Sequence, residues 1–470
     1  MIEQEKHVVV CGHVKHGKST FTGRLLVETG AIGPAEVDRI WQEAQLQPAY
    51  LERPKDYNKY QAITLRHRGA TFNSPGVLND QSRTVFPARG RILTNRGPFT
   101  LIDNPGHHTY IDNIVYGIYL ADSAIIVVGA NDGVAEGTER VARILEGLKV
   151  PVLGVCITKM DMVNYSPARF DEVRAQIVEL LEHRNLTTND GPPVIPTSSL
   201  EGAGFGFAQC KGDEVLRSWY KGPSVADLLE IADDHEARLA HGQLRIVVGG
   251  PSEVRSPEGV GTVVIGSLES GTVTPGDELV IVPVPEQEPR TLRVKSVRRA
   301  RTVSEGRTED TDSVGARAIV SLAIKGVQAS DLKRSMRHGA VLGRPSDPPQ
   351  TAYAATCNLV FFENETVYSD KEFQLHCHGS RVPCRIVNLM DDRSGLDNNA
   401  EYVGEFVHAS INFEKAFSME RAEDFPRLAR FVLREKYKIV ACGVCVDLYQ
   451  TPAERRLFRR DDAPITAVSG

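Results

Sequence analysis

A short loop near the start of the chain has the residue types and spacing of a phosphate-binding site. Residues 12–19 match the pattern G-x-x-x-x-G-K-[ST]. In such a loop main-chain N–H groups surround the phosphates, the lysine ammonium lies at the β- and γ-phosphates, and the last hydroxyl ligates Mg²⁺. Here those two side chains are Lys18 and Ser19. The nucleotide-contacting residues predicted from this loop are Gly12, His13, Val14, Lys15, His16, Gly17, Lys18, Ser19 and Thr20.

The segments on either side of the loop provide the context that it requires. Residues 7–11 are apolar and β-branched, which is typical of a buried parallel strand. Residues 20–27 begin polar and then place apolar side chains at helical spacing. Strand, glycine loop and helix together predict a nucleotide site. The loop alone leaves a kinase, an ATPase and a GTPase open.

Two short motifs at the ends of later strands indicate which nucleotide is bound. Asp103 begins the sequence D-x-x-G, which places a carboxylate near Mg²⁺ and the N–H of Gly106 near the γ-phosphate. Thr158, Lys159 and Asp161 belong to a second motif, Thr-Lys-Met-Asp. A carboxylate at position 161 can accept from both N1–H and the exocyclic amine of guanine. Adenine lacks this donor pair, so a buried Asp161 would reject it.

A third motif follows the next strand and supports the same base. Ser198, Ser199 and Leu200 stand where a backbone N–H can reach guanine O6. Each motif is weak by itself, but their order, spacing and positions after strands favour GTP and GDP over ATP. The predicted cofactors are therefore GTP or GDP and Mg²⁺.

Composition limits the class of protein. The chain has 470 residues, 41% of them hydrophobic and 25% charged, as in ordinary globular proteins with several domains. No apolar run has the length of a membrane span, so we expect a cytoplasmic protein without membrane contact. A net charge of −6 argues against non-specific nucleic-acid binding over the whole surface. Cys442 and Cys445 have zinc-site spacing but lie in an apolar run, and we interpret them as core thiols.

The pattern along the chain predicts three domains. Strands are predicted at 7–11, 99–102, 123–128, 152–157 and 194–197, and helices at 138–148 and 167–181, as in a doubly wound sheet. From residue 244 onward short β-runs broken by Gly and Pro predict small barrels. We expect an α/β P-loop GTPase domain with a mostly parallel sheet at 1–235, β-barrel domain 2 at 243–348, β-barrel domain 3 at 351–452, and a tail at 453–470.

With these motifs the chain resembles translation-factor GTPases of the elongation factor Tu and elongation factor 1-alpha family. The resemblance rests on residues 12–20, 103–107, 158–161, 198–200, 259–266, 271–276, 376–378, 382–384 and 427–431. It implies a G domain and two barrels that hold aminoacyl-tRNA in the GTP state and release it to the ribosome after GTP hydrolysis. It also implies a monomer whose partners are the ribosome and an aminoacyl-tRNA or a tRNA-like protein, with a nucleotide-exchange factor as an optional partner.

The resemblance assigns roles to individual residues. Lys18 would stabilise phosphate charge, and His107 matches the family's catalytic histidine, which orients the attacking water. Two threonines compete for the switch-I position, Thr64 and Thr71. We choose Thr64, because Phe72 then falls where the family carries an aromatic residue on the next strand. The predicted Mg²⁺ ligands are Ser19, Thr64 and Asp103.

Several departures from the family pattern predict a divergent paralogue. Lys15 stands where the family has aspartate, and Thr158 stands where it has asparagine. Residues 75–99 make the expected hairpin about twenty residues longer than the family's. Other functions therefore remain open besides delivery to the ribosome. They are a family member recruited to metabolism, such as a regulatory GTPase subunit of ATP sulfurylase, a ribosome-rescue GTPase, and a nucleotide-binding module without turnover.

Overall fold

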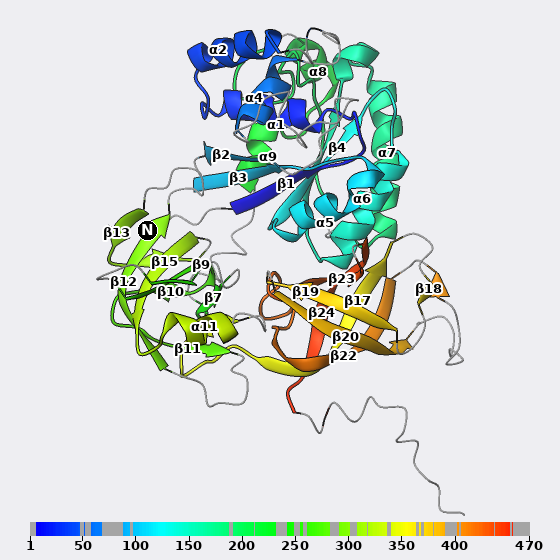
Figure 1. The fold of residues 1–470 in the computed structure, drawn as a ribbon. Coiled ribbons are helices and arrows are strands. Elements are labelled where there is room, and N and C mark those ends of the chain that lie inside the picture. Colours follow the sequence, from blue (N-terminus) through cyan, green and yellow to red (C-terminus); the bar gives the residue numbers. More distant parts are fainter. Residues whose placement is uncertain are drawn as a thin grey trace, which may run out of the picture. The chain divides into compact units, whose positions relative to one another are not determined.

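The computed structural model divides the chain into two compact units, residues 5–233 and residues 1–4 with 234–470 (Figure 1). It describes the chain except for residues 1–5, 48–50, 52–57, 68–87, 95–96, 188–190, 211, 232–241, 249–253, 257–260, 283–290, 301–307, 317, 336–339, 363–365, 368–370, 379, 391–401, 404–405, 437, 452–453 and 455–470.

A six-stranded sheet forms the centre of the first unit, in the order β2-β3-β1-β4-β5-β6. All neighbours are parallel except the β2–β3 hairpin. The strands predicted from apolar runs are confirmed, with ends that differ by one or two residues. The strands are β1 (Lys6–Cys11), β2 (Ala88–Thr94), β3 (Gly97–Asp103), β4 (Ser123–Gly129), β5 (Val152–Thr158) and β6 (Val194–Pro196).

Helices cover both faces of this sheet (Figure 1). They are α1 (Lys18–Glu28), α2 (Pro34–Gln45), α4 (Lys59–His67), the short η2 (His108–Tyr110), α5 (Ile111–Tyr119), α6 (Glu136–Gly147), the short η3 (Met160–Val163), α7 (Pro167–His183), α8 (Asp213–Trp219) and α9 (Val225–Ile231). Side chains of a strand alternate between faces, so Val8 and Val10 join the core beneath α1 and α9. The helices predicted at 138–148 and 167–181 are observed as α6 and α7.

The topology places the ends of several strands next to one another. β1 pairs with β3 on one side and β4 on the other, so the direction of winding reverses at β1. In open α/β sheets, ligands bind at the carboxyl ends of the strands beside such a point. The loop after β1 and the motifs that end β3 and β5 all lie at this edge.

The predicted hairpin insertion requires a correction. We expected the extra residues inside the hairpin, but β2 and β3 are joined by residues 95–96 alone. Residues 75–87, the rest of that segment, lie outside the described residues. The apolar run at the end of the predicted insertion pairs with its neighbour instead of looping out, because Ile92 is buried opposite Phe99.

The first β-domain of the second unit consists of antiparallel strands whose pairings return to their start. β11, β16, β7, β9, β15 and β12 pair in turn, and β12 pairs again with β11. The elements are β7 (Arg245–Val247), β8 (Val254–Arg255), β9 (Thr262–Ser270), β10 (Thr272–Val273), β11 (Glu278–Val282), β12 (Thr291–Ala300), β13 (Thr308–Thr311), β14 (Val314–Gly315), β15 (Ala318–Lys325), α11 (Ala329–Ser335) and β16 (Val341–Gly343).

The second β-domain is a closed barrel in the order β17-β22-β20-β19-β23-β24. Cys442 and Cys445 are buried in β24, in agreement with the core strand predicted there. Its elements are β17 (Thr351–Phe361), β18 (Thr366–Val367), β19 (Glu372–Cys377), β20 (Ser380–Met390), β21 (Tyr402–Val403), β22 (Phe406–Ser418), β23 (Arg430–Glu435) and β24 (Lys438–Tyr449). Two antiparallel β-domains after a doubly wound sheet confirm the predicted fold class.

A buried ion pair links the two β-domains. Arg245 of β7 is 1% exposed, and its Nε lies 2.5 Å from Oε1 of Glu420, which follows β22. Its Nη1 also donates to Oδ2 of Asp347 at 3.0 Å. The guanidinium lies 4.7 Å from the ring centroid of Phe425. Among the described residues, no helix is both long enough and apolar enough to cross a membrane.

Candidate nucleotide-binding site

The phosphate loop is a tight connection between β1 and α1. Gly12 has φ +140°, and a Cβ there would lie 2.2 Å from the carbonyl oxygen of Val127, so only glycine fits. Gly17, with φ +93°, precedes the first residue of α1. The N–H groups that begin α1 therefore lie next to the loop, in the arrangement that binds anions.

Lys18 places its ammonium inside this loop. Nζ donates to the carbonyl oxygen of His13 at 2.7 Å. Burial lowers the pKa of Lys18 to about 8, while the carboxylate of Asp103 acts in the opposite direction. A Cβ at Gly106 would lie 2.3 Å from this Nζ, so the glycine of D-x-x-G lies directly beside the loop. The backbone at 106 and the cation, the two groups predicted to contact a γ-phosphate, thus lie next to each other.

The three predicted Mg²⁺ ligands come from three different elements and lie close together. The hydroxyl of Ser19 donates to Oδ2 of the buried Asp103 at 2.7 Å. The hydroxyl of Thr64, on α4, donates to the main-chain oxygens of Ser19 at 2.8 Å and of Tyr60 at 3.1 Å. α4 approaches α1 this closely because Gly23 has no side chain; a Cβ there would lie 2.0 Å from the Tyr60 carbonyl oxygen.

The donor atoms suit the metal. A hydroxyl and a carboxylate are the hard oxygen ligands that Mg²⁺ prefers. In this structure the hydroxyl of Thr64 is 2% exposed and bonded to main chain, so its role as a ligand stays a prediction. The competing Thr71 lies outside the described residues.

His107 follows the D-x-x-G motif and lies at the start of η2. Its Nδ1 accepts from the N–H of Thr109 at 3.4 Å, which leaves the proton of the neutral ring on Nε2. Its ring centroid lies 4.3 Å from that of His108, which is exposed. His107 is partly exposed beside the phosphate loop.

Thr158, in place of the family's asparagine, is bonded to the phosphate loop. The sequence left open whether a contact is lost or replaced by a hydroxyl. In the structure the Thr158 hydroxyl donates to the carbonyl oxygen of His16 at 2.7 Å. The carbonyl oxygen of Val128 lies 3.3 Å from the same hydroxyl. The residue is 1% exposed. The end of β5 thus holds the phosphate loop through a hydroxyl.

The residues predicted to read guanine are brought together. The hydroxyl of Ser198 donates to Oδ1 of Asp161 at 2.6 Å. Ser198 and Ser199 are buried, and Leu200 is 54% exposed. Lys159 has a left-handed backbone, with φ +61°, and burial lowers the pKa of its ammonium.

The other residues of the loop occupy distinct environments. His16 is fully buried, and burial lowers its pKa to about 3, so the ring is neutral at physiological pH. His13 accepts at Nδ1 from the N–H of Gly137 at 3.2 Å. Thr20 is buried and accepts from Asn58 at 3.1 Å. Lys15, with φ +63°, is exposed, and Val14 is partly exposed.

Sequence reasoning missed three residues that support this site. Arg24 of α1 bonds to the Tyr60 hydroxyl of α4 and lies 3.4 Å from the carbonyl oxygen of Leu200. Tyr165 and Glu201 form a hydrogen bond behind the guanine motifs. No motif or periodicity marks these residues, because each acts through partners far away along the chain.

Comparisons with known proteins agree with this geometry. Residues 3–238 match the family model "Elongation factor Tu GTP binding domain", and residues 354–446 match "GTP-eEF1A C-terminal domain-like". Elongation factor 1-alpha of Thermofilum pendens is 30% identical over 471 residues, which cover 95% of this chain and 99% of that protein. Elongation factor 1-alpha of Methanocaldococcus jannaschii is 29% identical over 458 residues, covering 94% and 97%.

Solved structures share the fold at low identity. The GTPase-like domain of S. cerevisiae Ski7, bound to GTP, has a TM-score of 0.67 at 14% identity and covers 95% of this chain and 98% of its own. Elongation factor SelB of Methanococcus maripaludis, in complex with a GTP analogue, has a TM-score of 0.52 at 18% identity, covering 97% and 81%. The predicted resemblance is confirmed. The chain belongs to the elongation factor Tu and elongation factor 1-alpha family of translational GTPases, as a divergent member.

Proposed function

We propose that this protein binds and hydrolyses GTP and, cycling between GTP and GDP states, delivers an aminoacyl-tRNA or a tRNA-like cargo to the ribosome. The observation that supports this most directly is the meeting of four motifs, each at the end of a strand, at one edge of the sheet. Lys18 and Ser19 meet Asp103 there, and Asp161 pairs with Ser198. This set has groups for phosphates, for a metal and for guanine.

The chemistry requires little more than charge and position. The Lys18 ammonium and the loop N–H groups offset the charge that develops on the β- and γ-phosphates. Ser19, Asp103 and Thr64 would hold Mg²⁺, which would neutralise phosphate oxygens when bound. The carboxylate of Asp161 would accept from guanine, and a backbone N–H around Ser199 would donate to the base oxygen.

His107 would position the attacking water. Its neutral ring carries the proton on Nε2 when Nδ1 accepts from Thr109. Because the residue stands on a short helix after Gly106, a small movement of this segment would bring the ring towards the γ-phosphate. Ribosome binding would supply that movement in the proposed cycle.

The same proposal extends to partners and compartment. The two β-domains would carry the cargo, and a nucleotide-exchange factor would be an optional partner. The protein would act in the cytoplasm as a monomer.

The test is single-turnover GTP hydrolysis with and without ribosomes, alongside binding of a fluorescent GDP. We expect tight GDP binding and ribosome-stimulated hydrolysis. Stimulation by a metabolic enzyme such as ATP sulfurylase, but not by ribosomes, would instead identify a member recruited to metabolism. Binding without any stimulated turnover would reduce the protein to a nucleotide-binding module.

A further inference from the structure

The guanine motif ends in a strained backbone segment. Lys159, Asn164 and Tyr165 all have positive φ, at +61°, +52° and +52°. Such values are uncommon for side chains larger than glycine, and for a bulky aromatic residue they persist only where the surroundings impose them. The segment is closed by two main-chain hydrogen bonds, from Tyr165 to Met160 at 2.8 Å and from Asn164 to Asp161 at 3.3 Å.

The contacts of the Tyr165 side chain hold the backbone in this conformation. The residue is only 8% exposed, and its hydroxyl donates to the carboxylate of Glu201. Burial and the neighbouring Glu201 raise the pKa of Tyr165 above its ordinary value, so the hydroxyl keeps its proton. Its ring end lies against Gly212, where a Cβ would be 2.3 Å from the hydroxyl oxygen.

Glu201 extends this connection to the base-reading carboxylate. Its main-chain N–H donates to the hydroxyl oxygen of Ser198 at 3.2 Å, and Ser198 donates its hydrogen to Oδ1 of Asp161 at 2.6 Å. A serine hydroxyl has a single hydrogen. It goes to Asp161, because a carboxylate oxygen can only accept, while the Ser198 oxygen accepts from the Glu201 N–H.

We propose that Tyr165 and Glu201 are positioning residues that orient Asp161 through Ser198 and thereby set the preference for guanine over hypoxanthine. This inference rests on the proposed binding of guanine nucleotides. Guanine presents two donors to the carboxylate, so both oxygens of Asp161 must lie in the plane of the base. Hypoxanthine lacks the exocyclic amine and presents one, so it tolerates a rotated carboxylate.

The test compares the dissociation constants of GDP and IDP for wild type and Tyr165→Phe. The phenylalanine keeps the buried ring and removes only the hydroxyl. We expect GDP to bind up to about tenfold more weakly, the scale of one neutral hydrogen bond, while IDP changes little. The preference for GDP, which is the dissociation constant of IDP divided by that of GDP, should therefore fall. As single variants, Glu201→Gln should keep more of the wild-type preference for GDP over IDP than Glu201→Ala does. The glutamine amide oxygen can still accept from the Tyr165 hydroxyl, whereas alanine cannot.

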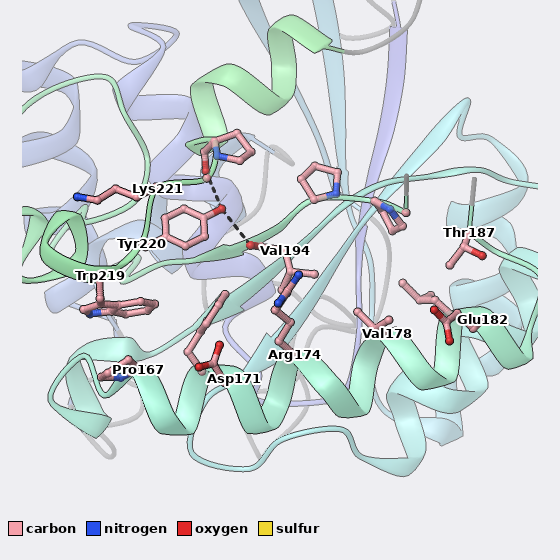
Figure 2. Close-up of a pocket in the computed structure, with 17 residues that line it drawn as sticks. Pro167, Asp171, Arg174, Val178, Glu182, Thr187, Val194, Trp219, Tyr220 and Lys221 are labelled. Atoms are coloured by element: carbon pink, nitrogen blue, oxygen red, sulfur yellow. Dashed lines mark hydrogen bonds between the residues drawn. The ribbon is translucent and has the colours of Figure 1, made fainter. Parts of the chain in front are cut away.

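Tyr220→Phe is the matched control in the same unit. The Tyr220 hydroxyl donates to main-chain oxygens of Val194 at 3.0 Å and Pro223 at 3.1 Å, in a pocket beside α7 that does not include the guanine motifs (Figure 2). Its removal should leave the ratio of GDP to IDP affinity unchanged.

One outcome would contradict the role of Tyr165, and another would contradict the proposed function. If Tyr165→Phe weakens GDP and IDP equally, or changes neither, the residue is structural and the inference is wrong. If the wild type shows no preference for GDP over IDP and ADP, the proposed function itself fails.

Discussion

Replacing Lys18 with methionine should stabilise the nucleotide-free protein while removing nucleotide binding. Burial lowers the pKa of Lys18 from 10.5 to about 8, a difference of two and a half units. At about 1.4 kcal/mol for each unit, holding the buried cation costs the folded state roughly 3 to 4 kcal/mol. Methionine has a similar length and no charge. It loses the hydrogen bond to His13, worth about 1 kcal/mol, so we expect a net gain of about 2 kcal/mol at pH 7.

The pH dependence distinguishes this cause from improved packing. Because the folded state releases its proton more readily than the unfolded state, the cost is fully present below pH 8 and disappears as the pH rises from 8 to 10.5. The advantage of Lys18→Met should therefore shrink over that interval. The other titratable groups affect variant and wild type equally, so their contributions cancel in the difference between the two free energies of unfolding.

The assay is denaturant unfolding of the nucleotide-free protein, followed by tryptophan fluorescence. Both tryptophans, Trp41 and Trp219, lie in the first unit, so the signal reports on the fold that holds Lys18. Lys15→Met is the control, since Lys15 is an exposed lysine of the same loop. A Lys18→Met variant that is less stable than wild type at pH 7, or whose advantage is constant from pH 7 to 10.5, would refute the reasoning.

Three further predictions concern nucleotide chemistry. Asp161→Asn should weaken GTP binding by several kcal/mol, on the order expected when a charged contact is lost, and admit xanthosine nucleotides; equal GTP affinity in a competition assay would remove Asp161 from the site. His107→Ala should keep GTP binding and slow ribosome-stimulated hydrolysis roughly a hundredfold, and an unchanged single-turnover rate would point to another residue. Lys15 replaces an aspartate that helps the family hold a monovalent cation, so wild-type turnover should not depend on potassium. If its ammonium replaces that cation, Lys15→Ala should slow turnover and Lys15→Asp should restore part of it only in potassium. A strong potassium dependence of the wild type would contradict both the loss of the cation site and its replacement by the ammonium.

Much of the fold was predictable from local patterns. β1, β4 and β5 are continuous apolar runs because both faces of a parallel sheet are buried, and such runs can be recognised without knowing their partners. The phosphate loop was predictable for a related reason. Gly12 and Gly17 are needed by the local backbone itself, with φ +140° and +93°.

Contacts between distant segments were not predictable in the same way. The bond between Thr158 and the carbonyl of His16 joins residues 142 positions apart, and nothing at either position indicates it. The same holds for Tyr165 and Glu201, whose pairing depends on how two loops approach each other. The short connection between β2 and β3 was not predicted, because the length of a segment alone does not show where a strand begins.

The sequence by itself determined which chemical groups are available and in what order they follow the strands. That was enough to indicate a guanine nucleotide, because parallel strands bring their carboxyl ends to one edge whatever the length of chain between them. Only the tertiary structure decided which side chains meet there. Ser19 donates to Asp103 across 84 positions, Lys18 is buried deeply enough for its pKa to fall, and Ser198 donates to Asp161. These depend on burial and on side-chain direction, which are set by the packing of elements that are distant in the sequence.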